Sequence, residues 1–294
     1  MSLIEVRLEI APEFASAIDE HLLESEAGEW SVLEDVIVKR AWLVGIFQDH
    51  AQATARTEEL LGGLPCKPLS PASVKRIEDA DWKESYKAHF KAWQFGRLHW
   101  VPIWEKAAFQ LPEGDVVLWL DPGLAFGTGN HETTRLCIEH LVTHSLGLGS
   151  VKVAKARVVD AGCGSGILAL SASLLGYGSV DGFDNDPEAV RVSIENAALN
   201  RLDGRVHFHA DDLVTGLAEG AADVLLANIQ SDILLAFHRP LLRAVAPGGV
   251  LILSGILASE IDAVSRGFAA AAPGWSLHTR VMGEWSAALL GRPL

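Results

Sequence analysis

The stretch Arg157–Gly166 reads RVVDAGCGSG and decides the fold of this chain. A short apolar run ends in Asp160, three glycines follow at alternate positions, and the helix-forming run Ile167–Leu175 comes next. This order predicts a strand, a tight turn and a helix. Glycine lets the backbone turn sharply where a side chain would collide with a ligand, and the start of a helix offers unpaired N–H groups to a carboxylate or phosphate. The stretch therefore predicts a loop that binds a nucleotide-like cofactor.

The spacing of the glycines indicates which cofactor the loop binds. A nicotinamide dinucleotide needs G-x-G-x-x-G, whose third glycine would fall on Ile167, whereas this chain has Gly162, Gly164 and Gly166. The next predicted strand leads into Asp184, 22 residues after the first glycine, where an acid can hold both hydroxyls of a ribose. This combination resembles class I S-adenosylmethionine (AdoMet) methyltransferases. A turn of small residues that serves close packing alone is the alternative.

The composition describes a globular chain of two domains. The 294 residues are 49% apolar and 21% charged, and no run of about 18 apolar residues occurs, so no membrane span is expected. The first residues, MSLIEVRLEI, alternate apolar and charged side chains and predict a strand instead of a signal peptide. The net charge of −14 disfavours nucleic acid and favours neutral or basic partners, with plain solubility as the alternative explanation.

The cysteines point to a reducing compartment. Cys66, Cys137 and Cys163 are odd in number and form no C-x-x-C pair, so neither a disulfide framework nor a zinc site is predicted. The run that begins at His131 starts like the zinc motif H-E-x-x-H, but Arg135 stands where the second histidine is needed. We therefore expect a cytoplasmic protein without a bound metal.

Residues 1–69 are predicted to form a small ferredoxin-like α+β domain. The predicted elements are, in chain order, a strand at 2–10, a helix at Pro12–Ala27, strands at Trp30–Arg40 and Ala41–Asp49, a helix at Ala51–Leu61 and a closing strand at Cys66–Leu69. The order β-α-β-β-α-β is that of the split βαβ unit. Nothing in this domain resembles a catalytic site, so its predicted role is docking.

Residues 70–96 are predicted to form a linker region between two domains. Asp81 can cap a helix here, and Trp82, Tyr86 and Phe90 recur every four residues along one face of that helix. The stripe predicts a helix that packs on one or both domains. An ordinary amphipathic surface helix is the alternative.

Residues 97–294 alternate strands and helices, which predicts a doubly wound, mostly parallel α/β sheet of the Rossmann-like kind. Beside the glycine turn, the predicted elements are strands at Leu98–Ile103, Val116–Leu120, Val180–Phe183, 205–210, 222–228 and Val250–Leu253, and helices that end near Leu146 and span 187–200 and 232–245. Ligands of such sheets bind at the carboxyl ends of the strands. Asp160, Asp184, Asp211 and Asn228 lie at predicted strand ends, so we expect one cleft there.

Asn228 is the predicted catalytic residue. It ends the apolar strand ADVLLAN, so its side chain is expected to project into the cleft, where the amide oxygen can accept a hydrogen from an attacking amine. A turn-forming asparagine is the alternative. Asp186 is predicted to cap the helix after Asp184, and Asp211 or Asp212 either accepts a hydrogen bond from the adenine amino group or caps a helix.

The order of several further motifs carries a closer resemblance. The segments DPGLAFGTG, HETT, VVDAGCGSGILAL, ANI, PGGVLILSGIL and GEWSAALLGR follow one another as in ribosomal protein L11 methyltransferases, and the linker region is similar as well. The resemblance covers nearly the whole chain. It implies AdoMet as the cofactor and ribosomal protein L11 as the partner, methylated on lysine side chains and an N-terminal amine and held by the N-terminal domain.

The resemblance also implies roles for individual residues. The positions that contact AdoMet in the family match Thr134, Gly162, Asp184 and Asn228. The loop that covers the cofactor matches Phe126, Gly127 and Thr128. We expect in-line methyl transfer without an obligatory general base, in a dry cleft to which the aromatic side chains of Trp104 and Trp119 contribute.

Two segments on the substrate side depart from the family pattern. Residues 130–132 read Asn-His-Glu where the family usually has Thr-His-Pro, and Gln230–Ile233 stands where a Leu-Ala-x-Pro type run is usual. The alternative acceptors are therefore another protein or a small amine. A nicotinamide oxidoreductase is disfavoured by Ile167 and by the segment Glu284–Arg292, and a non-catalytic binding protein is disfavoured by the intact Asn228.

Overall fold

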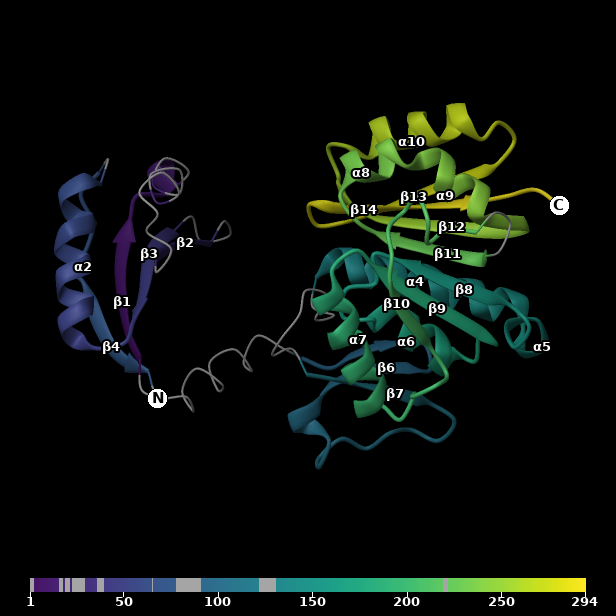
Figure 1. Ribbon diagram of the computed structural model, residues 1–294, viewed down its shortest axis with the longest axis horizontal. Helices are drawn as coiled ribbons and strands as arrows, with labels where there is room; N and C mark the ends of the chain where they lie inside the picture. Colours follow the sequence, from purple (N-terminus) through teal and green to yellow (C-terminus); the bar gives the residue numbers. More distant parts are fainter. Residues whose placement is uncertain are drawn as a thin grey trace. The chain divides into compact units, whose positions relative to one another are not determined.

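The computed structural model describes residues 3–15, 18, 22, 30–35, 40–64, 66–77, 91–121, 131–218 and 222–294. The chain divides into two compact units, which comprise residues 1–89 and 90–294 (Figure 1). Among the described residues, no helix is both long and apolar enough to cross a membrane.

In the described part of the N-terminal unit, four antiparallel strands form a sheet, and helix α2 (His50–Gly63) covers one face of it (Figure 1). The strands are β1 (Leu3–Ile10), β2 (Trp30–Asp35), β3 (Arg40–Phe47) and β4 (Ser73–Ile77), in the spatial order β2-β3-β1-β4. This is the strand order of the predicted ferredoxin-like unit. The 3-10 helix η1 (Pro12–Phe14) begins the stretch predicted as a helix over Pro12–Ala27, most of which lies outside the described residues.

The prediction of a closing strand at Cys66–Leu69 is wrong, because the fourth strand is β4. The segment contains Pro68, which cannot donate a ladder hydrogen bond, and it contacts β1 through the bond from Leu69 N to Glu9 O (2.7 Å). β4 is an exposed edge strand without clear apolar alternation, so its sequence carries little strand signal. It falls within the stretch 70–96 predicted as linker, and the helix predicted in that stretch lies outside the described residues.

The C-terminal unit is built on a seven-stranded sheet with the order β10-β9-β8-β11-β12-β14-β13. Its strands are β8 (Arg157–Ala161), β9 (Ser179–Asp184), β10 (His207–Ala210), β11 (Ala222–Asn228), β12 (Val245–Leu257), β13 (Ser276–Met282) and β14 (Trp285–Gly291). The first five in this order pair in parallel, and β14 runs antiparallel to both of its neighbours. The mostly parallel, doubly wound sheet predicted from the sequence is therefore confirmed, and the strand order reverses beside β8, where such sheets bind ligands.

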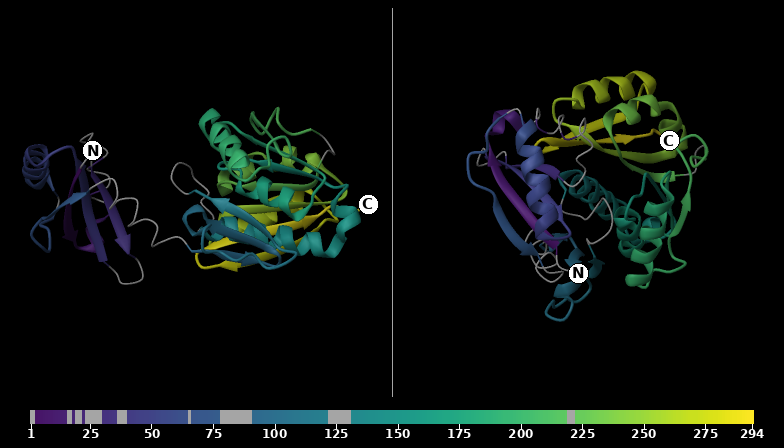
Figure 2. Two further views of the ribbon diagram at one scale, coloured as in Figure 1. Left: turned by 90° about the horizontal axis from the view of Figure 1, so that it is seen from below. Right: turned by 60° about the vertical axis from the view of Figure 1, so that its left-hand side comes forward.

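Helices cover both faces of this sheet (Figure 2). One face carries α4 (Glu132–Leu148), α6 (Ile167–Leu175) and α7 (Pro187–Leu199), with the short α5 (Ser150–Val153) after α4, and the other face carries α8 (Ser231–Ala236), α9 (His238–Ala244) and α10 (Ile261–Ala271). The neighbouring β8 residues Val158 and Val159 point to opposite faces and belong to two separate apolar cores. A strand buried on both faces reads as a continuous apolar run, as the sequence does here.

The helix predicted over 232–245 is two helices, α8 and α9, which meet at Phe237. Pro240 lies in the first turn of α9. In one continuous helix Pro240 would lack the N–H that bonds to the carbonyl of Ala236, and its ring would collide with that carbonyl. The break places the aromatic ring of Phe237 at the cavity described below.

A small second sheet packs on the far side of α6 in the same unit (Figure 1). It consists of β5 (Trp93–Phe95), β6 (Leu98–Pro102), which leads into the 3-10 helix η2 (Ile103–Glu105), and β7 (Val116–Leu120). β5 pairs antiparallel with β6, and β6 pairs parallel with β7. The indole of Trp100, which is fully buried, donates to Ser171 Oγ of α6 (2.9 Å). This bond fixes the small sheet to the helix that follows the glycine turn.

Candidate functional site

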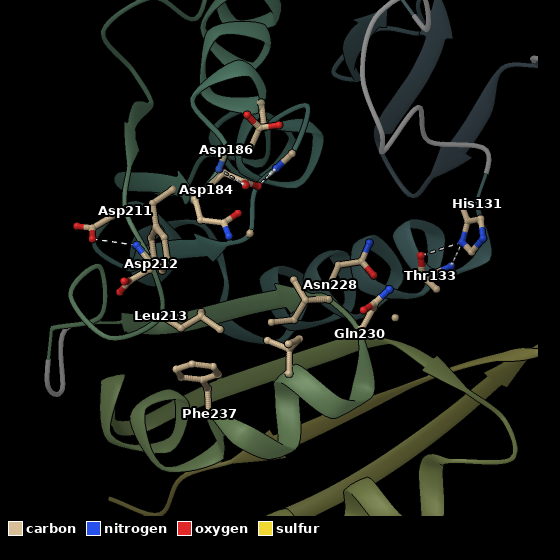
Figure 3. Close-up of a pocket in the computed structure, with 18 of the residues that line it drawn as sticks. His131, Thr133, Asp184, Asp186, Asp211, Asp212, Leu213, Asn228, Gln230 and Phe237 are labelled. Carbon is tan, nitrogen blue, oxygen red and sulfur yellow. Dashed lines mark hydrogen bonds between the residues drawn. The ribbon is translucent and has the colours of Figure 1, made fainter. Parts of the chain in front are cut away.

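A cavity of about 790 Å³ opens at the carboxyl ends of the central parallel strands. Its walls come from the glycine turn, the strand ends, the residues around the start of α4, and α8 (Figure 3). Asp184, Asp211 and Asn228, three of the four predicted strand-end residues, line it. The fourth, Asp160, is buried, with 1% of its surface exposed. The predicted cleft and the cavity therefore coincide.

The glycine turn needs glycine for reasons of backbone conformation and space. Gly162, Gly164 and Gly166 have φ values of +75°, +52° and +76°, which favour glycine. A Cβ atom on Gly162 would lie 2.6 Å from Cγ2 of Ile229. The N–H of Gly162 also donates to the carbonyl of Phe183 (2.9 Å), which joins the turn to β9. Because the backbone of Gly162 and Gly164 lines the cavity, a ligand can approach the chain itself.

The carboxylate of Asp184 is held at the cavity wall by two backbone groups. Its Oδ2 accepts from Gly164 N (2.9 Å) and its Oδ1 accepts from Asp186 N (3.1 Å) (Figure 3). Asp186 in turn caps α7, since its Oδ1 accepts from Glu188 N (2.9 Å), as the sequence predicts. Each oxygen of Asp184 keeps a further lone pair, so a carboxylate of fixed orientation faces the cavity.

Asp211 and Asp212 differ in what they do in the loop after β10. Oδ1 of Asp212 accepts from Val214 N (2.7 Å) and Thr215 N (2.9 Å), and these hydrogen bonds lower the pKa of Asp212. Asp212 therefore holds a turn together and caps no helix, because residues 213–216 form a turn and a bend. Oδ1 of Asp211 accepts from Asp212 N (2.9 Å), and both aspartates line the cavity.

Asn228 stands at the end of β11, and the first turn of α4 contacts it. Its Nδ2 donates to Oγ1 of Thr134 (3.4 Å), a side chain that is 2% exposed. Thr134 thus supports Asn228 from behind the cavity wall instead of lining the cavity. Because Nδ2 is the donor to Thr134, the other amide atom, Oδ1, is the one suited to accept a hydrogen bond from a ligand.

An aromatic pair forms the wall near Asn228. The rings of His131 and Trp285 meet edge to face with centroids 4.8 Å apart, and both residues line the cavity. His131 caps α4, where its Nδ1 lies 2.9 Å from Oγ1 of Thr133 (Figure 3). The expectation that Trp104 and Trp119 stand at this wall is wrong, because they lie in η2 and β7 of the small sheet.

The opposite end of the cavity is apolar. Leu213 and Phe237 line it beside Asp211 and Asp212 (Figure 3). The sequence predicts no role for Leu213, Phe237 or Trp285. The segment GEWSAALLGR carried a signal for Trp285, since it is among the motifs of the resemblance, whereas Leu213 and Phe237 look like ordinary core residues in the sequence.

A buried acid lies beneath the turn. Oδ2 of Asp160 accepts from Ala169 N (3.1 Å), and Oδ1 has no hydrogen-bond partner among the described residues. Burial, together with the nearby carboxylate of Asp184, raises the pKa of Asp160 to about 7. Asp160 can therefore gain or lose its charge near neutral pH.

Comparison with known proteins places the chain in a family. A family model described as Ribosomal protein L11 methyltransferase (PrmA) matches residues 5–292. The chain belongs to this family. The predicted family resemblance is confirmed, and the match extends across both compact units.

Individual members of the L11 methyltransferase family are similar over most of their length. A ribosomal protein L11 methyltransferase of Pelobacter propionicus is 40% identical over 254 residues, which cover 84% of this chain and 80% of the relative. One of Pseudomonas aeruginosa (strain LESB58) is 38% identical over 291 residues, 92% of each chain. The crystal structure of a ribosomal protein L11 methylase from Lactobacillus delbrueckii subsp. bulgaricus aligns with a TM-score of 0.59 and 30% identity, covering 70% of this chain and 100% of that one.

Described residues of both segments that depart from the usual L11 methyltransferase pattern line the cavity, among them His131 in the first segment. Gln230 and Ile233 line it, and Oδ1 of Asp232 accepts from Ile233 N (2.8 Å) at the start of α8. Glu132 forms an ion pair with Arg135 (2.7 Å) in the first turn of α4. Within the described part of the chain, no group of three or more His, Cys, Asp or Glu side chains could hold a metal ion.

The structure therefore brings most of the predicted site residues together. Gly162, Gly164, Asp184, Asp211 and Asn228 line one cavity, as the strand-end argument predicts. Thr134 contacts Asn228 from behind the cavity wall. The remaining candidates, Phe126, Gly127 and Thr128, lie outside the described residues.

Proposed function

We propose that this chain transfers methyl groups from AdoMet to amino groups of ribosomal protein L11, on lysine side chains and on the N-terminal amine. The observation that carries the proposal is the position of Asn228, a hydrogen-bond acceptor held at one end of a cavity whose other end has the features of a nucleoside site. Membership of the L11 methyltransferase family supports the choice of acceptor. The acceptor is also the reason to place the reaction in the cytoplasm.

The cavity has the features that AdoMet requires. Its volume of about 790 Å³ lies within the usual range for small-molecule sites. Asp184 would hold the ribose hydroxyls, Asp211 the adenine amino group, and the apolar side chains of Leu213 and Phe237 the adenine ring. A Cβ on Gly162 would displace Ile229 in the cavity wall, so position 162 requires glycine. When bound, AdoMet supplies a methyl group activated by its sulfonium.

Asn228 would orient the acceptor amine. A nucleophilic amine needs its lone pair directed at the reacting carbon, and a hydrogen bond from one N–H to Oδ1 of Asn228 constrains that direction. Thr134 contributes by accepting from Nδ2, which fixes the rotation of the amide. This hydroxyl is buried, so water does not compete for the bond.

The aromatic wall would favour the neutral, reactive form of the amine. A lysine amine has a pKa near ~10.4, so on the order of one in a thousand is neutral at pH 7. Burial next to the rings of His131 and Trp285 disfavours the charged ammonium and lowers its pKa. No general base is needed, because the proton can leave before the amine is enclosed.

We also propose that the N-terminal unit holds the protein substrate. The face of its sheet opposite α2 carries Leu33, 48% exposed, and Trp42 on the neighbouring strand. The guanidinium groups of Arg7 and Arg40 lie 4.5 and 5.0 Å from the centre of the Trp42 ring. An apolar centre with charged surroundings is typical of a protein interface. Leu33→Glu is expected to raise the KM for the protein acceptor and to leave the Kd for AdoMet unchanged.

Intact-protein mass spectrometry of L11 after incubation with the chain and AdoMet tests the proposed function. We expect mass increases in methyl-sized steps, and peptide mapping is expected to place them on lysines and the N-terminus. Asn228→Ala should lose at least about 90% of the rate, on the scale of one oriented hydrogen bond, and retain its affinity for AdoMet. Asn200→Ala is the matched control, since that asparagine binds the backbone of Trp119 (2.7 and 3.0 Å) in the small sheet.

Absence of a mass increase with AdoMet binding intact would refute L11 as the acceptor. The divergent segments 130–132 and Gln230–Ile233 would then direct the search to other proteins and small amines. Full activity of Asn228→Ala would instead refute the role assigned to that amide.

A further inference from the structure

Arg135, a side chain outside the cavity, joins the methyl-transfer site to the small sheet. It lies in the first turn of α4, and its side chain is 13% exposed. Its Nη2 donates to Oε1 of Glu132 (2.7 Å), three residues earlier in the same helix. Its guanidinium carbon lies 4.3 Å from the centre of the Trp93 ring on β5. Arg135 is therefore held between a carboxylate of its own helix and an aromatic ring of another sheet.

Trp93, the ring that Arg135 contacts, is held in the small sheet. It pairs across the small sheet with Trp100, whose buried indole donates to Ser171 of α6. The ammonium group of Lys91 also lies near Trp93, 4.2 Å from the ring centre. A planar guanidinium stacked on an indole has both cation–π attraction and a large contact area. The stack thus ties the start of α4 to a sheet that is itself bonded to the core.

The first turn of α4 carries the parts of the site that face the acceptor. His131 and Thr133 line the cavity, and the hydroxyl of Thr134 accepts from Asn228. That bond is 3.4 Å long, near the upper limit for a hydrogen bond, so a small displacement of the turn would break it. Asp184 and the glycine turn stand instead at the ends of β9 and β8, where hydrogen bonds between the two strand ends hold them.

We propose that Arg135 is a positioning residue for methyl transfer, which fixes the first turn of α4 so that Thr134 keeps the amide of Asn228 oriented. The inference rests on the proposed function and deepens it. Because hydrogen bonds at the ends of β8 and β9 hold Asp184 and the glycine turn, Arg135 is proposed to act on the transfer step and not on cofactor affinity. A misplacement of about 1 Å at a reacting centre can cost about a hundredfold in rate.

The test compares the steady-state constants and the AdoMet affinity of single variants in the full chain. Arg135→Gln is expected to lower kcat by at least about tenfold, with KM and the Kd for AdoMet within about twofold of the parent. Arg135→Lys should retain part of kcat, because it keeps the charge beside Glu132 but loses the planar stack. Trp93→Ala should match Arg135→Gln, Trp93→Phe should retain more activity, and the double variant should lose no more than the poorer single variant.

Arg191→Gln is the matched control. Arg191 pairs with Glu188 and Glu195 on the exposed side of α7, another helix of the same unit. Its loss is expected to leave kcat unchanged. A merely structural role for Arg135 would lower the melting temperature and change KM and the AdoMet Kd together with kcat, and that pattern would overturn the proposal, as would wild-type kcat in Arg135→Gln.

A spectroscopic readout keeps the inference separable from the choice of acceptor. In 15N-labelled chain, the side-chain amide signals of Asn228 are identified by their loss in Asn228→Asp. They should shift in Arg135→Gln and stay in place in Arg191→Gln, whether or not L11 is methylated. Signals that stay in place in Arg135→Gln would overturn the positioning role even if the parent methylates L11. If the signals shift in Arg135→Gln but the parent does not methylate L11, only the choice of acceptor is refuted.

Discussion

Replacing Asp160 by asparagine is expected to raise the unfolding free energy of the protein in the absence of AdoMet and to weaken AdoMet binding. Asp160 is the last residue but one of β8 and is 1% exposed. Its Oδ2 accepts a hydrogen bond from Ala169 N (3.1 Å), while Oδ1 is unsatisfied within the described residues. A charge buried in this way costs free energy. Burial and the neighbouring carboxylate of Asp184 accordingly raise the pKa of Asp160 to about 7 from the usual 3.8.

The sign and size of the effect follow from proton linkage. Between pH 4 and 7 the folded chain keeps the proton of Asp160 after the unfolded chain has released it, so this group's contribution to stability falls as the pH rises through that window. At about 1.4 kcal/mol for each pH unit, the difference between 3.8 and about 7 amounts to about 4 kcal/mol at pH 8. Asparagine, which resembles the protonated acid in shape and charge, avoids this cost.

The assay is urea unfolding of the parent and Asp160→Asn at a series of pH values from 4 to 8. We expect nearly equal stability near pH 4 and a growing advantage of the variant up to about pH 7, because titrating groups that do not interact with Asp160 contribute alike to both chains. A difference that does not depend on pH, or a variant less stable at pH 8, would refute the assignment. AdoMet is a cation, so its Kd should improve with pH in the parent and lose this dependence in the variant.

Three further changes test separate parts of the site. Asp184→Ala should raise the Kd for AdoMet at least about tenfold, since it removes a charged hydrogen-bond acceptor, whereas Asp184→Asn should lose less; equal affinity measured by calorimetry would contradict the ribose assignment. Thr134→Val should lower kcat with little change in the AdoMet Kd, because the amide of Asn228 then rotates freely. An unchanged kcat in the mass-spectrometric assay would contradict the role of Thr134 in orienting Asn228. Gly162→Ala should destabilise the fold by about 1–3 kcal/mol, since its φ is +75° and the new Cβ would lie 2.6 Å from Ile229; urea unfolding measures this, and a stability within about 0.5 kcal/mol of the parent would show that the turn tolerates a side chain.

The regular elements of the C-terminal unit could largely be predicted from the sequence. The helix Ile167–Leu175 and the strand Val116–Leu120 have the predicted bounds, because glycines or polar residues delimit strongly apolar runs. The strands β4, β5, β13 and β14, the helix α10 and the break at Phe237 were missed. β4 buries too little surface to show an apolar pattern, and Pro240 is compatible with a helix start, so only its position relative to α8 reveals the break.

The site could be predicted where its chemistry is polar and lies at a strand end. Asp184 and Asn228 are conspicuous because each follows a buried strand, and both line the cavity. Phe237 and Trp285 were not assigned, since an apolar side chain that faces a cavity has the same sequence pattern as one that faces the core. Trp104 and Trp119 were chosen for their residue type alone, and the fold carries them into η2 and β7.

The sequence by itself determined the glycine turn, the parallel sheet around it and the polar strand ends, because these depend on conformational limits and apolar periodicity within a few neighbouring residues. Only the tertiary structure decided that Arg135 stacks on Trp93, that Thr134 supports Asn228 across 94 positions of the chain, and that the pKa of Asp160 approaches neutrality. Each of these depends on distances between residues far apart in sequence and on the water excluded between them. No local pattern records such distances.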